Sequence, residues 1–293
     1  MTPVVVPALA TLRNRLGEGA IWHARTGRLY WVDIVGHTVH GYEPATGRTF
    51  TALVGESVGT VVPTRRSEVL VALQSRFAFL DLAQARLTPF PVGPLLSSDH
   101  RFNDGKCDSA GRLWVGSMAV EATLGDGQLW CLLPELRAEP RRLNLTIPNG
   151  IAWSRDGRTL YHIDSPTQRV EAFAFDPVDG ALSAPRTLRE FAPGEGSPDG
   201  MTIDAEGLLW VALWDGWRVV RLDPVTGGTR DAIPLPVQRP TSCAFGGPAL
   251  DTLYITSASL GLTTEQQAAQ PLAGAVFEIK PGVAGVPAQE FAG

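Results

Sequence analysis

The chain has 293 residues and a formal net charge of −5, and hydrophobic residues make up 44% of it. With 31 glycines and 23 prolines, this composition indicates a globular, turn-rich protein, and a barrel or propeller of this length can form one domain, expected here over residues 1–293. The acidic balance argues against nucleic-acid binding, which normally requires a basic patch or stripe.

Short runs of β-branched and aromatic residues recur along the chain, each after a turn, with starts 40 to 49 residues apart. The six runs are 29–33, 69–73, 113–116, 160–164, 209–212 and 253–256. Each is preceded by a shorter apolar run, at 20–22, 60–62, 105–107, 151–153, 201–203 and 243–245, and is followed by a third. Six copies of a multi-strand unit with a period in the forties predict an all-β fold, a six-bladed β-propeller.

Two segments fall outside this repeat. Thr263 and Gln266 have the spacing of a capping box and Pro271 follows, which predicts a short helix over 263–270. At the chain ends, we expect the strand 4–6 and the segment 289–291 to meet in one blade and close the ring, because closure removes an open sheet edge.

The first strand of each propeller blade lines the central channel, so the residues that introduce these strands face one another. These residues are Glu18, Val58, Asp104, Asn149, Asp199 and Thr241. Four of the six carry a carboxylate or amide oxygen and are followed by glycine. Asn-Gly and Asp-Gly are also the commonest hairpin-turn dipeptides, so turn chemistry is sufficient for any one of them alone.

Two features favour a metal site over a set of turns. Glu18-Gly19 is not a preferred turn dipeptide, and 148–150 and 198–200 repeat one Pro-X-Gly corner in consecutive blades. Oxygen ligands that converge on one axis repel each other unless a cation offsets them. Carboxylate and amide oxygens without His or Cys favour Ca²⁺, Mg²⁺ or Mn²⁺, with Zn²⁺ possible in a hydrated site. The sequence therefore predicts one divalent metal ion.

Several motifs carry a family resemblance: 101–106 (Arg-Phe-Asn-Asp-Gly-Lys), 116–118, 148–150, 198–201 and 245–247. Together they closely resemble the regucalcin/gluconolactonase (senescence marker protein) family, from about Gly17 to the C-terminus. The resemblance implies a six-bladed propeller, in agreement with the repeat. It implies that Glu18, Asn149 and Asp199 hold the metal, with waters completing the shell. It also implies substrate contacts from Arg101, Asn103 and Glu121, with Asp199 as a candidate general base.

The implied reaction is the opening of a sugar lactone to an aldonic acid, and the residues suit it. A divalent ion can polarise the lactone carbonyl or lower the pKa of a bound water, and Asp199 can accept a proton as water attacks. Arg101 and Asn103 can donate hydrogen bonds to hydroxyls or to the developing oxyanion, and Glu121 can accept one. Without the resemblance, Arg101 and Glu121 are better explained as surface charges. Asp104 either belongs to the cluster or caps the turn at Asn103.

Two other functions stay open: a non-catalytic calcium-binding propeller, and a metal-dependent esterase or phosphotriesterase on the same fold. The substrate residues argue against the first, because an ion buffer needs no sugar contacts. The loop 121–128 is shorter than in animal regucalcins, which leaves gluconolactone, a pentonolactone and other rings open as substrates. The sequence 55–59, Gly-Glu-Ser-Val-Gly, matches a nucleophile elbow, but a strand is expected after it where that motif needs a helix.

The cysteines and the N-terminus bear on the compartment. Cys107, Cys131 and Cys243 are odd in number and lie among apolar residues, which predicts buried reduced thiols. The N-terminus has no basic region ahead of its short apolar run, and no apolar run approaches the ~20 residues of a membrane span. We expect a cytoplasmic monomer whose partner is a small-molecule sugar lactone, with neither nucleic acid nor membrane as a partner.

Overall fold

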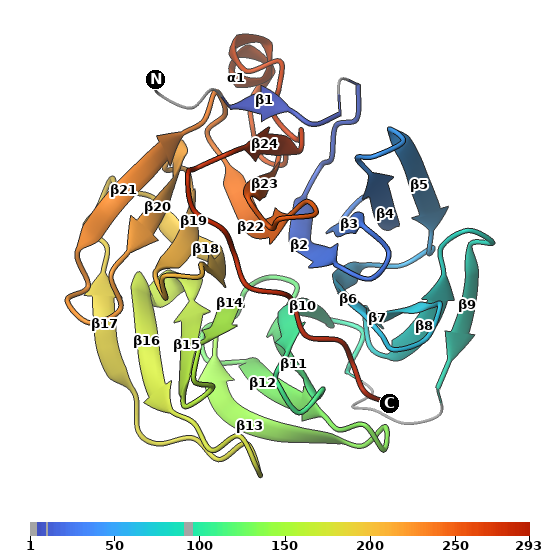
Figure 1. The fold of residues 1–293 in the computed structure, drawn as a ribbon, viewed down its shortest axis with the longest axis vertical. Helices are drawn as coiled ribbons and strands as arrows, with labels where there is room; N and C mark the ends of the chain where they lie inside the picture. The colour runs from blue at the N-terminus through green and yellow to red at the C-terminus, as the bar shows by residue number, and fades with distance from the viewer. Residues whose placement is uncertain (1–4, 10, 91–95) are drawn as a thin grey trace.

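The computed structural model describes residues 5–9, 11–90 and 96–293, and arranges them as six four-stranded antiparallel sheets in a ring (Figure 1). The first three blades are β2 (Gly17–His23), β3 (Arg28–Asp33), β4 (Thr38–Glu43), β5 (Arg48–Leu53); β6 (Val58–Pro63), β7 (Val69–Leu73), β8 (Phe77–Asp81), β9 (Arg86–Pro89); and β10 (His100–Cys107), β11 (Leu113–Ala119), β12 (Gly127–Leu132), β13 (Ala138–Leu145). The next two are β14 (Pro148–Trp153), β15 (Thr159–Asp164), β16 (Arg169–Ala174), β17 (Arg186–Glu190); and β18 (Ser197–Ile203), β19 (Leu209–Trp214), β20 (Arg218–Leu222), β21 (Thr229–Pro234). The last blade is β22 (Pro240–Gly246), β23 (Thr252–Ser257), β24 (Phe277–Ile279) and β1 (Val6–Pro7). The predicted six-bladed propeller is confirmed.

The N-terminal strand closes the ring, but with a partner that differs from the prediction. Val6 pairs with Glu278 of β24, so β1 forms the outer strand of the last blade. The expected partner, the segment 289–291, instead crosses one face of the ring, where Phe291 forms a parallel bridge with Thr64 beside β6. That part of the prediction is wrong, because the Phe291 ring is fully buried in the core near β6. Residue 4 of the predicted strand lies outside the described residues.

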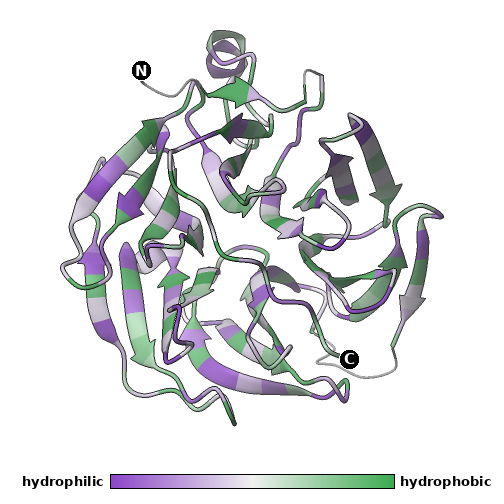
Figure 2. Ribbon diagram, in the orientation of Figure 1, coloured by the Kyte–Doolittle hydropathy of each residue, from purple (hydrophilic) through white to green (hydrophobic). Residues whose placement is uncertain are grey.

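The core lies between neighbouring blades. Every residue of the inner strands β2, β6 and β22 is buried, because other blades pack on both sides of these strands. The outer strands β9 and β21 are mostly exposed. Figure 2 shows the result, with hydrophilic bands along the outer strands of the ring. This burial gradient explains why the inner strands appear in the sequence as short, continuous apolar runs.

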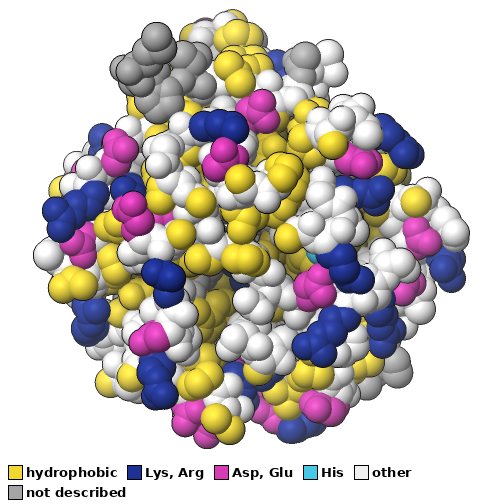
Figure 3. Space-filling view, in the orientation of Figure 1, with side chains coloured by type: hydrophobic (Ala, Val, Ile, Leu, Met, Phe, Trp, Pro, Cys, Tyr) yellow, Lys and Arg dark blue, Asp and Glu magenta, His cyan; other side chains and the backbone are white. Residues whose placement is uncertain are grey.

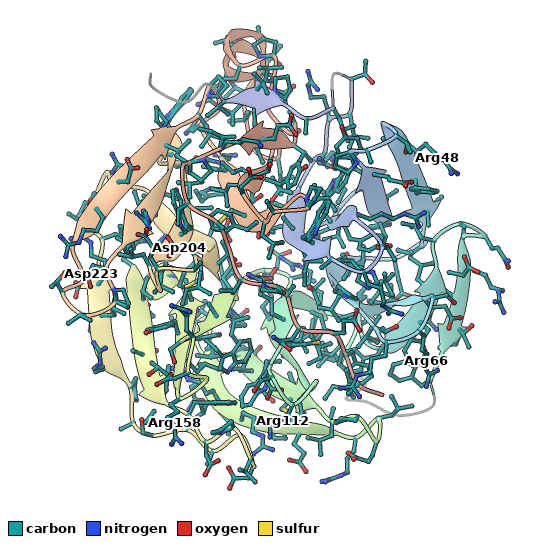
Figure 4. The ribbon with its side chains drawn as sticks, in the orientation of Figure 1. Arg48, Arg66, Arg112, Arg158, Asp204 and Asp223 are labelled. Atoms are coloured by element: carbon teal, nitrogen blue, oxygen red, sulfur yellow. The ribbon has the colours of Figure 1, made fainter. Side chains whose placement is uncertain are left out.

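A buried aspartate anchors the inner hairpin in two blades. In the blade of β10, Asp108 accepts hydrogen bonds from the indole of Trp114 (2.8 Å) and from Arg112 (2.6 Å). In the blade of β18, Asp204 accepts one from Trp210 at 2.9 Å, six residues later as before, and one from an arginine of β20. Figure 4 labels Arg112 and Asp204, which come from different blades. In each of these blades the buried aspartate therefore connects the turn after the inner strand to the second strand.

The remaining sequence predictions about elements are also met. The helix α1 (Thr264–Ala269) has the predicted capping box, in which Thr263 and Gln266 bond each other's backbone N–H. A 3₁₀ turn, η1 (Ser165–Thr167), follows β15. The strand β6 begins at Val58, so the sequence 55–59 leads into a strand and is not a nucleophile elbow. All three cysteines are buried and free. No helix among the described residues is long and apolar enough to cross a bilayer.

Candidate metal centre

Four of the six channel-facing positions form a buried polar cluster at one end of the inner strands. Glu18, Asp104, Asn149 and Asp199 come from β2, β10, β14 and β18, and each is at most 6% exposed. In all four strands the pairing register shifts at this point, which marks a β-bulge. A bulge redirects a side chain from the sheet face, and it is a frequent device beside functional sites.

The glycines that follow these residues do not make hairpin turns. Gly150 and Gly200 lie inside β14 and β18, and neither has a positive φ. A Cβ at Gly150 would lie 2.5 Å from the Asp199 carbonyl oxygen, and one at Gly200 would lie 2.6 Å from the hydroxyl of Ser242. These glycines therefore let neighbouring inner strands approach closely enough for their side chains to meet. Turn chemistry, the simpler explanation of the Asn-Gly and Asp-Gly pairs, does not apply here.

Several oxygens of the cluster have no hydrogen-bond partner among the described residues. They are Asn149 Oδ1, Asp199 Oδ1 and Asp104 Oδ2, and all are buried. Leaving buried oxygens unpaired is costly, so this arrangement suits a ligand that accepts electron pairs from all of them. Among the described residues, no group of three or more His, Cys, Asp or Glu side chains is arranged so that these side chains alone could hold a metal ion. The predicted set has only two carboxylates and takes its third oxygen from the amide of Asn149, and its donor chemistry fits a hard divalent cation.

The electrostatics of the cluster also favour a cation. Burial, and after it the nearby Asp104 carboxylate, raise the pKa of Glu18 to about 8. The pKa of Asp199 is raised well above its ordinary value, first by burial and then by Glu18 and Asp104. Burial lowers the pKa of Arg101 to about 10, against the attraction of Glu18 and Asp199. Without a cation these buried carboxyls therefore keep their protons to a higher pH than usual, and a divalent ion would lower their pKa values.

Arg101 and Asn103 are placed beside the cluster and hold each other. The Arg101 guanidinium donates to Asn103 Oδ1 at 2.7 Å and to the Phe102 carbonyl at 3.0 Å. The Asn103 amide donates in turn to the carbonyl of Pro148 at 2.9 Å. Pro148 directly precedes Asn149, so Asn103 links β10 to the strand of a predicted metal ligand. Arg101 is half-buried, whereas Asn103 is buried, so Arg101 presents more surface to an incoming molecule.

Glu121 is not brought into contact with this cluster. It is exposed and lies in the turn after β11, where the Ala122 N–H donates to the Ala119 carbonyl. Among the described residues the structure records no hydrogen bond or ion pair of its carboxylate. Its predicted substrate contact therefore depends on a ligand that reaches this loop.

Sequence reasoning missed one residue that the structure places behind the cluster. Ser165, the first residue of η1, accepts a hydrogen bond from Asn149 Nδ2 at 3.1 Å and donates one to the Pro198 carbonyl at 2.7 Å. It thereby leaves Asn149 Oδ1 free to face the cluster and joins β14 to β18 just before Asp199. A lone serine after a strand-end aspartate carries no signal in sequence. Asp104, left open above, is placed inside the cluster, with Oδ1 accepting from the Gly105 N–H at 2.8 Å.

Comparison with known proteins gives consistent matches. Residues 16–259 match the family model described as the SMP-30/Gluconolactonase/LRE-like region. Regucalcin from Gallus gallus is 38% identical over 299 residues and covers 100% of both chains. A Bacillus subtilis (strain 168) protein named as a sugar lactone lactonase, YvrE, is 34% identical over 284 residues, covering 97% of each chain. The solved structure of a calcium-binding protein, regucalcin, from Agrobacterium tumefaciens has a TM-score of 0.90 at 27% identity, covering 96% of this chain and 95% of that one.

Proposed function

Since the chain belongs to the SMP-30/gluconolactonase/LRE-like family, we propose that it is a divalent-metal-dependent lactonase that opens a sugar lactone to the aldonic acid. The observation that supports this most is the convergence of Glu18, Asn149 and Asp199, with two buried oxygens left unpaired, beside Arg101. A relative named as a sugar lactone lactonase adds support for the class of reaction.

In this proposal the chain supplies binding, orientation and a proton acceptor. A divalent ion held by Glu18, Asn149 and Asp199 would act as a Lewis acid toward the lactone carbonyl. The Asp199 carboxylate has one oxygen free of protein partners, and it takes the proton of the attacking water. Arg101 donates hydrogen bonds from its guanidinium to the oxygen that gains charge when the ring carbonyl is attacked.

Asn103 and Glu121 complete the proposed lactone site. Asn103 fixes the Arg101 guanidinium at 2.7 Å, and its second amide N–H remains available to a sugar hydroxyl. Glu121, on its exposed turn, accepts a hydrogen bond from a hydroxyl at the outer edge of the ring. The residues that select among gluconolactone, pentonolactones and other rings therefore include this loop.

The decisive experiment is acid release in a pH-stat with a panel of aldonolactones. The protein is stripped with a chelator and then supplied with Ca²⁺, Mg²⁺, Mn²⁺ or Zn²⁺ in turn. We expect turnover of at least one lactone, its loss on chelation and its return with one or more of these ions. Asp199→Ala is expected to lose both metal binding and turnover, while Asp231→Ala, on the exposed outer strand β21, serves as the matched control. Turnover that persists unchanged in the stripped protein would rule out the metal-dependent mechanism.

A second candidate is a non-catalytic calcium-binding protein. It is favoured by the regucalcin names among the relatives and by the calcium-binding protein of similar fold. Tight Ca²⁺ binding without turnover of any lactone would support it. An ester and phosphotriester panel, run in parallel, separates lactonase activity from a related hydrolase on the same fold. We also propose a cytoplasmic monomer, for which light scattering after gel filtration tests the oligomeric state.

A further inference from the structure

A cavity of about 330 Å³ lies between the C-terminal parts of five inner strands and residues 286–289. In each of their four inner strands, Glu18, Asp104, Asn149 and Asp199 come before the residues that line this cavity, and the lining includes Trp22 of β2, Trp153 of β14 and Phe245 of β22. One wall is the C-terminal strap, residues 284–292, which crosses this face in Figure 1. In Figure 3 hydrophobic side chains gather in the centre of the same face. A volume of this size falls in the range of small-molecule sites.

Five lining residues form one layer of the channel. Each pairs with an aromatic residue of the second strand in its own blade; the five are Ile21, Lys106, Ala152, Thr202 and Ala244. Three of these side chains are small, and they come from the consecutive blades of β14, β18 and β22. The space arises where these small side chains stand together, facing a lysine from β10.

Lys106 is the charged member of this layer. The chain contains 25 lysines and arginines, and only Lys106 and Lys280 are lysines, so the other 23 cations are arginines. Lys106 is half-buried, and its ammonium donates to the Met201 carbonyl across the channel. An ammonium carries three donors and Met201 takes one, which leaves donors for a ligand in the cavity.

The other polar groups in the lining make it rich in donors. The indole N–H of Trp153 is buried and has no partner among the described residues. The lining carboxylates are already engaged: Asp108 accepts from Arg112 at 2.6 Å, and Asp156 accepts from the Ser154 hydroxyl at 2.5 Å. A ligand that satisfies this site therefore brings an acceptor with negative charge, and the surrounding aromatic and aliphatic side chains demand an apolar body.

We propose that this cavity is a second ligand site, which binds a monocarboxylate with an apolar body. The carboxylate accepts hydrogen bonds from Lys106 and Trp153 at the inner end. The apolar part packs against Trp22, Phe245 and the strap residue Val286. The cavity is lined by other residues than those of the proposed lactone site, and its test does not depend on the lactonase activity.

The test uses octanoate as the probe and 1-octanol as its uncharged counterpart. Trp22 and Trp153 line the cavity, so binding to the purified full-length protein is followed by tryptophan fluorescence and by calorimetry. We expect saturable octanoate binding at least tenfold tighter than that of octanol. Lys106→Met should weaken octanoate binding to the level of octanol. Ala244→Phe, and the smaller Ala152→Leu, should fill the cavity and abolish binding of both probes, while Leu124→Phe on an exposed loop should change neither.

Three results would overturn the proposal: no saturable octanoate binding, equal affinity for octanoate and octanol, or unchanged binding in a folded cavity-filling variant. Circular dichroism shows whether each variant is folded. If Lys106→Met does not fold, the comparison of the two probes in the unaltered protein decides the role of charge. Because the readout is binding, loss of lactone turnover has no effect on the outcome.

Discussion

Ser165 determines how Asn149 presents its amide to the cluster. Its hydroxyl accepts from Asn149 Nδ2 and donates to the Pro198 carbonyl, so Asn149 Oδ1 remains the free atom. Removing a residue that hydrogen-bonds to a metal-ligating side chain typically lowers the metal affinity by 10–100-fold. In the proposed metal site, Ser165 would therefore orient the ligand Asn149 without contacting the metal ion.

Replacing Ser165 by alanine is expected to weaken divalent-metal binding by about tenfold, because the Asn149 amide loses its orientation. Calorimetry with Ca²⁺ or Mn²⁺ measures the affinity, and thermal unfolding of the chelated protein should change little. Ser165→Thr keeps the hydroxyl and should restore affinity. Unchanged metal affinity in Ser165→Ala would show that Asn149 is held by other contacts.

The raised pKa of Glu18 predicts how metal stabilisation depends on pH. The ordinary pKa of this carboxyl is near 4.5 and the folded value is about 8, so the metal-free folded protein binds a proton that the unfolded chain releases. Stability of the metal-free protein should therefore fall as pH rises from about 4.5 to about 8. At low pH, a metal ion that binds Glu18 must first displace this proton. At pH 8 a smaller fraction of Glu18 is protonated, so metal binding is opposed less.

The expected outcome is a larger rise in Tm on adding metal at pH 8 than at pH 5.5. Differential scanning calorimetry with chelator and with excess Ca²⁺ measures both values, and Glu18→Gln should reduce the pH dependence, with the raised pKa of Asp199 contributing the rest. An equal rise at the two pH values would contradict the assignment of Glu18 as a ligand that titrates in this range.

At the scale of single elements, the buried Asp204 holds the inner hairpin of its blade. It is fully buried and accepts from Trp210 and from Arg221, which it also pairs with at 2.7 Å. Removing Asp204 breaks its ion pair with Arg221 and leaves the buried Trp210 indole N–H without an acceptor, and the loss of one partner of a buried ion pair typically costs about 3–5 kcal/mol. Asp204→Ala should therefore lower the free energy of unfolding in urea by about that amount.

The matched control is Glu206→Ala, because Glu206 pairs with the same Arg221 at 2.7 Å but its side chain is 63% exposed. Exposed pairs contribute about 0–1 kcal/mol, so this variant should unfold almost as the unaltered protein does. Equal losses in the two variants would mean that the arginine, and not the buried aspartate, organises the corner.

The inner strands were predictable because buried strands require short runs of apolar residues, and such runs recur at regular intervals in the sequence. Each is a short apolar run before a turn, so the repeat located Glu18, Asp104, Asn149 and Asp199 at matching positions. The sequence could not place Ser165, because its role depends on contacts between neighbouring blades and not on local spacing.

The pairing of the chain ends was predicted only in part for a similar reason. The N-terminal strand closes the ring as predicted, but its sequence alone does not determine which strand edge it pairs with. Residues 289–291 lack a strand pattern with a specific partner, and long-range packing of one phenylalanine decides where they lie.

At the scale of the whole molecule, the ring is held by two devices. The β1 strand completes the last blade, and the C-terminal strap ties several blades together across one face. Its Gly285 N–H donates to Leu250 (2.8 Å), and its Ala292 N–H donates to Gly111 (3.0 Å). Glu290 bonds the His23 ring at 2.9 Å in a third blade. The strap therefore resists the separation of blades that are distant in sequence.

Phe291 is the part of the strap with the largest buried side chain, and its backbone N–H donates to the Pro63 carbonyl at 2.8 Å. Truncating a buried phenylalanine to alanine typically costs about 3–5 kcal/mol. Phe291→Ala should lower the free energy of unfolding by this amount. The control is Val178→Ala, which should have little effect because Val178 is 86% exposed. Urea unfolding measures both variants. If Phe291→Ala unfolds like the Val178 control, the strap does not stabilise the ring, and closure rests on β1 alone.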